Sequence, residues 1–420
     1  MSRRGYRWIA LGVSAAIFYV CLFVADFFLY ELGRALPIPA DIKDYLTSRG
    51  AFDQTSHPDY RRWLRAFVTT PGQPWEYEFR GDIVKVLRIT TGTPARKLVL
   101  PVDDLGFVNQ RPPADAEVLF LGDSFGRSAG CTFEETIPSF FEAIAGKKVY
   151  NASMQGYGLH QYVSILNRLT DDAGKDPHHF HAKEVYVLVY VGNDLKENID
   201  DYQERVAAES RPMLLPRLQL ETLRSIGDLT EQRLRNALRP WLGRNRTLSE
   251  EDFRTRTDGF YPVFLDLPPY RDVPVAFEPR LANYRTIDWL DAEREKVIES
   301  LLDRFRTLAS ERELTIRFAI LPVNVQVLGP HVIHDEMAAH YSFYGIYRPA
   351  AESFDKLAGF MKNEIGAAGF EVLDLTPALR AEAQRTQVYW PEDTHLTPIG
   401  NRVVAEELAR TFGSRPTRSP

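Results

Sequence analysis

A Gly-Asp-Ser-Phe-Gly run at residues 122–126 contains a candidate nucleophile, Ser124. It follows a short apolar segment and precedes a helical pattern, so Ser124 is expected at a strand-to-helix turn with an accessible hydroxyl. Such a serine suits acyl transfer, because its own amide can help to stabilise an oxyanion. The motif alone is weak support, since it is common.

Two further motifs supply hydrogen-bond donors. Residues 151–158 read NASMQGYG, and Gly156 would let a backbone N–H approach a reacting carbonyl without a side chain in the way. A Gly-Asn-Asp triplet at residues 192–194 offers the carboxamide of Asn193. Together with the amide of Ser124, these groups form the predicted oxyanion hole.

A candidate general base lies near the carboxyl end, in the segment WPEDTHLTPIG at residues 390–400. Thr397 and Pro398 are suited to start a helix, so His395 is expected on the loop just before it. Asp393 could hold the imidazole in the tautomer that accepts a serine proton. Glu392 is the alternative orienting carboxylate.

Short continuous apolar runs predict the strands that position these residues. Runs of this kind are typical of strands covered by helices on both faces, and they predict a doubly wound α/β domain. Its active site is expected beyond the carboxyl ends of the strands. The five predicted strands lie within residues 117–122, 147–153, 184–192, 314–322 and 370–375.

Helical patterns separate these strands. Thr132, with Glu135 three residues later, predicts a helix start, and Gly146 predicts its end. Further helices are expected at about 159–171, 288–311 and 351–367. Before the first strand, alternating residues between 75 and 102 predict a small antiparallel β unit.

Composition excludes several classes of protein. With 44% hydrophobic and 12% aromatic residues, the chain can bury a large core. The net charge of −6 and the lack of a basic stripe argue against a nucleic-acid partner. The two cysteines, Cys21 and Cys131, cannot make a disulfide framework.

The amino terminus predicts a single-pass membrane anchor. Residues 8–25 carry no charge, and an apolar helix can continue to about residue 32. Arg3, Arg4 and Arg7 precede it, which favours a cytoplasmic amino terminus and a periplasmic or extracellular catalytic domain. A cleaved signal peptide is the less favoured alternative, because the apolar stretch is long and lacks a clear cleavage site.

The domain organisation follows from these segments. Residues 1–34 are read as cytoplasmic tip and anchor, 35–113 as linker and β-rich lead-in, and 114–415 as the catalytic domain. An insertion at about 196–286 contains a helical pattern at 217–238 and an aromatic run at 260–270. It is interpreted either as a lid or substrate wall, or as a structural appendage with its own core.

The four motifs, in this order, resemble those of the SGNH or GDSL-type hydrolases, from about residue 117 to 408. The resemblance implies a flavodoxin-like five-stranded fold, with Ser124 as nucleophile, Gly156 and Asn193 in the oxyanion hole and His395 as base. The common family spacing puts the aspartate where Glu392 stands. Asp393 instead looks like the DxH arrangement of SGNH enzymes that acetylate exopolysaccharides such as alginate. Residues 100–109 are similar to the lead-in of membrane-anchored bacterial members.

The resulting hypothesis is an exported serine esterase that acts on O-acyl, especially O-acetyl, esters of a carbohydrate. A polysaccharide O-acetyltransferase with the same residues, or a non-catalytic glycan-binding component of an envelope assembly complex, is the alternative. No cofactor or metal is expected. The histidines at 178–181 and 331–340 are interpreted as solvated or packed side chains, with metal ligation the less favoured alternative.

Overall fold

The computed structural model describes nine stretches of the chain, and single residues are included among them. Two compact units are present, residues 1–67 with 209–246 and residues 68–208 with 247–420. All described residues belong to the second unit; the predicted anchor and linker and the predicted helix at 217–238 lie outside them. Within the described residues, no helix is both long enough and apolar enough to span a membrane. The described stretches are 72–81, 95–170, 179–195, 199, 262–271, 273, 275–277, 290–333 and 347–413.

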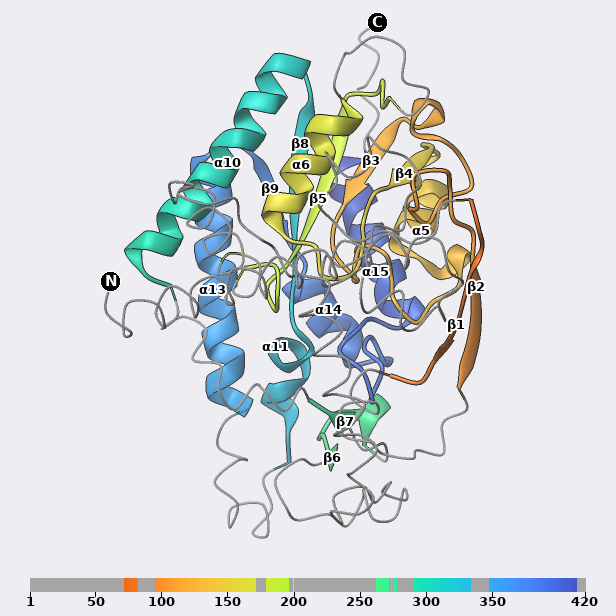
Figure 1. Ribbon diagram of the computed structural model, residues 1–420. Coiled ribbons are helices and arrows are strands. Elements are labelled where there is room, and N and C mark those ends of the chain that lie inside the picture. The colour runs from red at the N-terminus through yellow and green to blue at the C-terminus, as the bar shows by residue number, and fades with distance from the viewer. Residues whose placement is uncertain are drawn as a thin grey trace, which may run out of the picture. The chain divides into compact units, whose positions relative to one another are not determined.

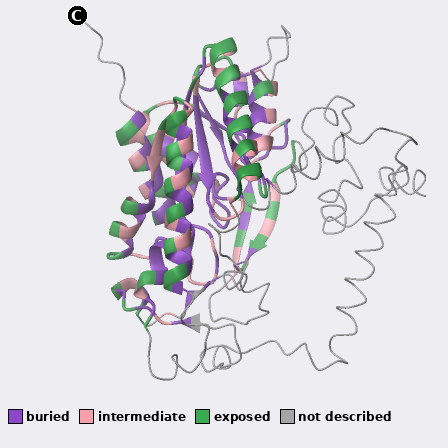
Figure 2. Ribbon diagram, turned by 90° about the vertical axis from the view of Figure 1, so that its left-hand side faces the viewer, coloured by how far each residue is buried: buried purple, intermediate pink, exposed green. Residues whose placement is uncertain are grey.

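A five-stranded parallel sheet forms the centre, as the apolar runs predict (Figure 1). Its strand order is β4-β3-β5-β8-β9, the doubly wound arrangement. Every residue of β3 is buried, and six of the seven residues of β5 are buried, so the sheet is covered on both faces (Figure 2). The strands are β3 (Val118–Leu121), β4 (Val149–Asn151), β5 (Glu184–Tyr190), β8 (Thr315–Leu321) and β9 (Glu371–Asp374).

The covering helices pack in pairs. α5 contacts α15, and α6 contacts α10. Right-handed crossovers between parallel strands put these two pairs on opposite faces of the sheet. The α-helices are α5 (Ile137–Ala145), α6 (Leu159–Leu169), α10 (Ala292–Arg312), α11 (Asn324–Leu328), α13 (Tyr347–Ala367), α14 (Thr376–Ala383) and α15 (Pro398–Phe412).

The predicted start of the first helix is wrong by one turn. Thr132 and Glu135 do form a capping box, but it belongs to the short 3-10 helix η2 (Phe133–Glu135). The α-helix α5 starts at Ile137, and the hydroxyl of Thr136 accepts a hydrogen bond from the amide of Ser139 at 3.3 Å. Gly146 ends the helix in the left-handed conformation, as predicted, with φ +66°.

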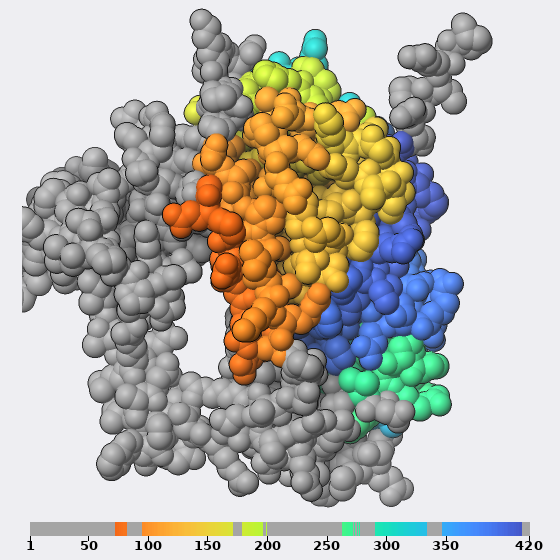
Figure 3. Space-filling view, turned by 90° about the vertical axis from the view of Figure 1, so that its right-hand side faces the viewer, coloured from red at the N-terminus to blue at the C-terminus, as the bar shows by residue number. Residues whose placement is uncertain are grey.

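A two-stranded antiparallel hairpin precedes the sheet. It consists of β1 (Trp75–Phe79) and β2 (Arg96–Leu100), and Trp75 pairs with Leu100. The predicted lead-in unit is therefore present, while its middle segment at 82–90 lies outside the described residues. Figure 3 shows the hairpin, in orange, on the surface of the described part.

The described residues of the insertion between 262 and 277 include Tyr270, which packs beside the segment that leads to His395. Tyr270 is fully buried; its hydroxyl donates to the carbonyl of Tyr389 at 3.2 Å and accepts from the Tyr389 amide at 3.0 Å. Tyr270 is therefore buried against the catalytic domain, next to the loop that carries His395. The remaining short elements are η1 (Pro113–Asp115), β6 (Pro262–Val263), η3 (Pro268–Tyr270), β7 (Val275–Ala276) and η5 (Gly329–His331).

Candidate active site

Ser124 lies where the strand order of the sheet reverses. Strand β3 pairs with β4 on one side and with β5 on the other. After β3 the chain forms β4 first and then crosses to form β5 on the opposite side of β3. Such a switch point opens a crevice beyond the carboxyl ends of the strands. Ser124 follows β3 by three residues and is half-buried, while its neighbours on both sides are buried.

The turn around Ser124 is held by close packing and hydrogen bonds. A Cβ at Gly126 would lie 2.4 Å from the hydroxyl oxygen of Ser153, so only glycine fits there. The Met154 amide donates to the carbonyl of Gly122 at 3.0 Å, and the Asn151 carboxamide donates to the Gly126 carbonyl at 3.2 Å. The loop after β4 therefore braces both ends of the nucleophile turn.

His395 joins Ser124 to a buried carboxylate. Its Nε2 lies 2.8 Å from the hydroxyl oxygen of Ser124, and its Nδ1 lies 2.5 Å from Oδ1 of Asp393. The same Oδ1 accepts the backbone N–H of His395 at 2.7 Å, which fixes the carboxylate. His395 is 5% exposed and Asp393 is fully buried. Of the two carboxylates considered, Asp393 is the one that the structure places against the imidazole.

The loop that carries His395 is anchored at both ends. The hydroxyl of Thr397 accepts the amide of Gly400 at 3.2 Å and so caps α15, which begins with Pro398 as predicted. Tyr389 and Leu396 form an isolated β-bridge across the loop. The histidine is thus presented by a short, closed loop at a helix start.

The residues of the predicted oxyanion hole follow three adjacent strands. Gly156 comes after β4, Ser124 after β3 and Asn193 after β5, and these strands are neighbours in the sheet. Gly156 has φ +70°, which favours glycine, and is exposed; Asn193 is half-buried. The structure therefore brings the predicted donors to the same edge of the sheet as the Ser124–His395 pair.

Two buried carboxyl groups lie beneath this edge. Asp123 accepts the Phe125 amide at 2.9 Å, and Asp194 accepts the Tyr190 amide at 2.9 Å and the Tyr162 hydroxyl at 2.7 Å. Burial raises the pKa of Asp123 to about 6. Burial, and then the charge of Asp123, raise the pKa of Asp194 well above its usual range. These side chains brace the loops after β3 and β5 through hydrogen bonds.

The sequence does not predict that the lead-in hairpin contacts the active-site loops. The Tyr77 hydroxyl accepts the amide of Gly130 at 3.2 Å, and Arg96 donates to the Gly130 carbonyl at 2.9 Å. The ring of Phe79 lies 5.9 Å from that of Trp390, which starts the histidine loop. The hairpin therefore contacts the loops that carry both Ser124 and His395. Only the clustering of aromatic residues in β1 could have signalled this.

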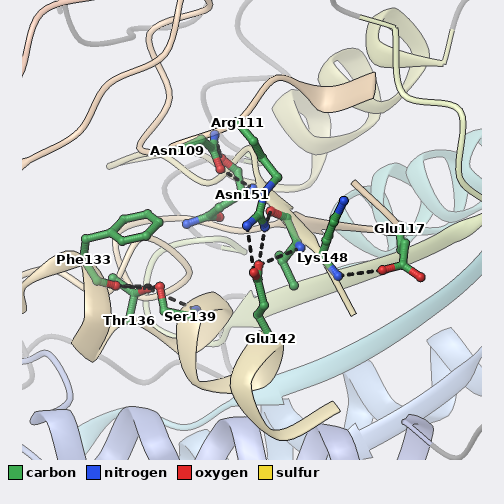
Figure 4. A network of polar contacts seen from close by, with 10 residues as sticks. Asn109, Arg111, Glu117, Phe133, Thr136, Ser139, Glu142, Lys148 and Asn151 are labelled. Carbon is green, nitrogen blue, oxygen red and sulfur yellow. Dashed lines mark hydrogen bonds and ion pairs between the residues drawn. The ribbon is translucent and has the colours of Figure 1, made fainter. Parts of the chain in front are cut away.

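The segment after the hairpin ties the lead-in to β4 (Figure 4). Asn109 accepts the amide of Asn151 at 2.8 Å and donates to its carbonyl at 3.0 Å. Arg111 forms an ion pair with Glu142 on α5. Burial by itself would raise the pKa of Glu142, but the contacts of its carboxylate, chiefly with Arg111, outweigh burial and lower the pKa. The lead-in is thus part of the same packed unit as the active site.

The histidine clusters give no metal site in the described part of the chain. There, no group of three or more histidine, cysteine or acidic side chains has the arrangement of a metal site. His331 approaches the Gln384 amide nitrogen at 3.3 Å, and burial lowers its pKa. His178, His334 and His340 lie outside the described residues.

Residues 344–419, which include Asp393 and His395, match the family model of the SGNH hydrolase-like domain of acetyltransferase AlgX. Among proteins with curated functions, none matches the chain.

Several solved structures resemble the chain at low identity. A lipolytic protein of the G-D-S-L family from Veillonella parvula has 11% identity and a TM-score of 0.30, covering 71% of this chain and 98% of that chain. A catalytic mutant of the acetylxylan esterase Axe2 from Geobacillus stearothermophilus has 10% identity and a TM-score of 0.31, covering 73% and 98%. Phospholipase A1 from Streptomyces albidoflavus has 9% identity and a TM-score of 0.32, covering 71% and 99%.

The family match covers the loop that carries His395. Ser124 lies outside the matched residues, on the turn after β3, and contacts His395 in the structure. A serine, a histidine and a buried aspartate in hydrogen-bond contact form the arrangement that activates a serine for acyl transfer. Residues 344–419 therefore match an SGNH hydrolase-like domain, and the serine, histidine and aspartate have the arrangement of an ester-bond hydrolase or acyltransferase.

Proposed function

We propose that this chain is a serine esterase that acts on O-acyl esters, chiefly O-acetyl esters of a carbohydrate, through an acyl-serine intermediate. The observation that carries the proposal is the contact series from Ser124 through His395 to Asp393, with distances of 2.8 and 2.5 Å. The acetyl part of the proposal is supported by the family model, which is named for an acetyltransferase. The carbohydrate part rests on the spacing of Asp393 and His395, which resembles that of SGNH enzymes that acetylate exopolysaccharides.

In the first step Ser124 attacks the ester carbonyl. His395 Nε2 takes the hydroxyl proton as the bond between the serine oxygen and the acyl carbon forms, and Asp393 stabilises the resulting imidazolium. The tetrahedral oxyanion is held by the amides of Ser124 and Gly156 and by the carboxamide of Asn193. The intermediate then collapses, the ester C–O bond breaks, and His395 returns the proton to the leaving alcohol.

In the second step the acyl group leaves Ser124. His395 removes a proton from the attacking hydroxyl, a second tetrahedral intermediate forms, and its collapse returns the proton to the serine oxygen. With water as nucleophile the product is a free carboxylic acid. With a sugar hydroxyl it is a new ester, so the alternative of an O-acetyltransferase uses the same residues.

The place of action is proposed from the sequence. Residues 8–32 would form an uncleaved anchor, with Arg3, Arg4 and Arg7 on the cytoplasmic side and the catalytic domain in the periplasm or outside the cell. An acetylated polysaccharide of the envelope, or a complex that exports it, would be the partner there.

The test is a product analysis with the full-length chain in detergent. The protein is incubated with p-nitrophenyl acetate, with and without oligosaccharide acceptors, and acetate and acetylated sugar are followed by mass spectrometry. Acetate alone supports the esterase, and acetylated sugar supports the transferase. If wild type and Ser124→Ala both yield neither product, a glycan-binding role replaces the catalytic one.

A further inference from the structure

A stack of aromatic rings lies against the imidazole of His395. The ring centroids of Phe125 and His395 are 4.8 Å apart, with 37° between their planes. Phe125 also stacks on Tyr190, with ring centroids 3.9 Å apart and 23° between the planes. Phe125 is 2% exposed, so its ring belongs to the core that packs against the histidine.

The stack is fixed from both ends. The Phe125 amide donates to Asp123, and its carbonyl accepts the Ser128 amide at 2.8 Å, so the nucleophile turn sets its position. The ring of Tyr190 lies over Gly192, where a Cβ would fall 2.2 Å from a ring carbon. Gly192 precedes Asn193, and the stack therefore connects the histidine to the loop of the predicted oxyanion hole.

The first step of the proposed reaction creates a positive charge on His395, beside the ring of Phe125. When His395 takes the proton of Ser124 it becomes an imidazolium, with Asp393 at one edge and the face of Phe125 beside it. An aromatic face attracts a cation within about 6 Å of the ring centroid. The neutral imidazole present before the step gains no such attraction, so the effect favours the charged intermediate state.

We propose that Phe125 is a positioning residue that fixes the plane of His395 and stabilises its imidazolium form during acyl transfer. The proposal deepens the proposed function, since it rests on His395 being the base. It assigns Tyr190 the task of holding the Phe125 ring in place, with Gly192 giving the room that this requires.

The other charged groups around the histidine must be separated from this effect. Asp393 faces His395 from its own loop, and Asp123 faces it from the nucleophile turn. Burial raises the pKa of Asp123 to about 6, and the charge of His395 opposes this rise. Tyr77 and Cys131 interact with Asp393 from the hairpin and the nucleophile loop. A pH–rate profile would report the ionisation of Asp123 together with that of the histidine, so it would not isolate the effect of Phe125.

The test therefore follows the imidazole directly. Full-length protein carrying labelled histidine is titrated by NMR, and the His395 signal is identified by its loss in His395→Gln. Phe125→Leu keeps an apolar side chain without a π face. We expect the pKa of His395 to fall by about half a unit to one unit, and kcat for a small ester to fall about threefold to tenfold with KM within about twofold.

A fluorinated series supplies a readout that packing alone would not give. Phenylalanine with one to three fluorine atoms at position 125 keeps its shape while its π face becomes less negative, so the His395 pKa should fall stepwise. The matched control is the same series at Phe141, a fully buried residue in edge-to-face contact with Phe120 and Tyr186. There the His395 pKa should stay constant.

An unchanged His395 pKa in Phe125→Leu and along the position-125 series would overturn the proposal. The titration is read without turnover, so it decides the role of Phe125 whatever the esterase assay gives. An absence of esterase activity with a normal fluorine series would instead count against the proposed function alone.

Discussion

Tyr77 on the lead-in hairpin accepts a hydrogen bond from the backbone N–H of Gly130 on the nucleophile loop, at 3.2 Å. Arg96 on the paired strand donates to the carbonyl of the same glycine at 2.9 Å. Both polar groups of Gly130 are thus satisfied by the hairpin. A segment that precedes the catalytic domain in the sequence is therefore part of the support of its active site.

Removing Arg96 should weaken both the fold and the turnover. Arg96→Met loses the bond to Gly130, the 2.7 Å ion pair with Glu135 and the position of the guanidinium 5.2 Å from the Trp390 ring centroid. We expect the free energy of unfolding to fall by about 1–2 kcal/mol and kcat to fall several-fold. Urea unfolding and ester hydrolysis measure the two effects.

The matched control is Arg80→Met, at the end of β1. Arg80 pairs with Glu78 at 2.6 Å, but both side chains are largely exposed, at 62% and 44%. Its loss should change stability by less than about 0.5 kcal/mol. Equal effects of the two substitutions would argue against a supporting role for the hairpin.

The two carboxylates of the histidine loop should differ sharply. Asp393→Asn removes the charge that balances the imidazolium and the acceptor that selects its tautomer, so kcat should fall on the order of 10³–10⁴-fold. Glu392→Gln is the paired control and should change kcat by less than about threefold. Steady-state hydrolysis of p-nitrophenyl acetate distinguishes them. A larger loss in Glu392→Gln would reverse the assignment.

Loss of an oxyanion donor should act on the rate rather than on binding. Asn193→Ala removes the proposed side-chain donor, and kcat should fall about a hundredfold to a thousandfold while KM changes little. Asn193→Ala with wild-type kcat would exclude this residue from the oxyanion hole. Asn401→Ala, at a buried asparagine on α15, is a control for general loss of stability.

The buried carboxyl pair should make stability depend on pH. A carboxyl group whose pKa is raised on folding stabilises the protein below its unfolded pKa, near 4, and this contribution is lost as the pH rises through the folded value. Burial raises the pKa of both Asp123, to about 6, and Asp194. We therefore expect the unfolding free energy to fall between pH 4.5 and 7.5 by more in wild type than in Asp194→Asn.

Denaturant unfolding at the two pH values measures this difference. Asp303→Asn, at an exposed position on α10 with an ion pair to Arg306, serves as the control and should follow the wild type. If Asp194→Asn also followed the wild type, the carboxyl of Asp194 would not be the group that titrates.

The fold was largely predictable because its signals are local. The run at 118–121 is wholly apolar and wholly buried, and each of the other four strands also contains a short apolar run. The start of α5 was misplaced although a signal existed. A helix from residue 133 would put Pro138 in its interior, where the missing N–H and the ring are unfavourable, whereas a start at Ile137 puts Pro138 in the first turn.

The site was predictable only in its motifs. The spacing of Asp393 and His395 is visible within one loop of the sequence. The sequence does not decide whether Asp393 or Glu392 orients the imidazole, whereas the buried contact of His395 with Asp393 does. The stack of Phe125 on Tyr190 and the bond from Gly130 to Tyr77 join residues far apart in sequence. Such contacts depend on how the loops pack, and no local periodicity encodes them.

The most direct measurement is to identify the residue that carries the acyl group. The full-length chain is mixed with an activated acetyl ester, quenched in acid, digested and analysed by mass spectrometry. The account predicts an acetylated peptide with the group on Ser124, absent in Ser124→Ala and formed far more slowly in His395→Gln. Acetylation at another residue during turnover, or full turnover by Ser124→Ala, would contradict it.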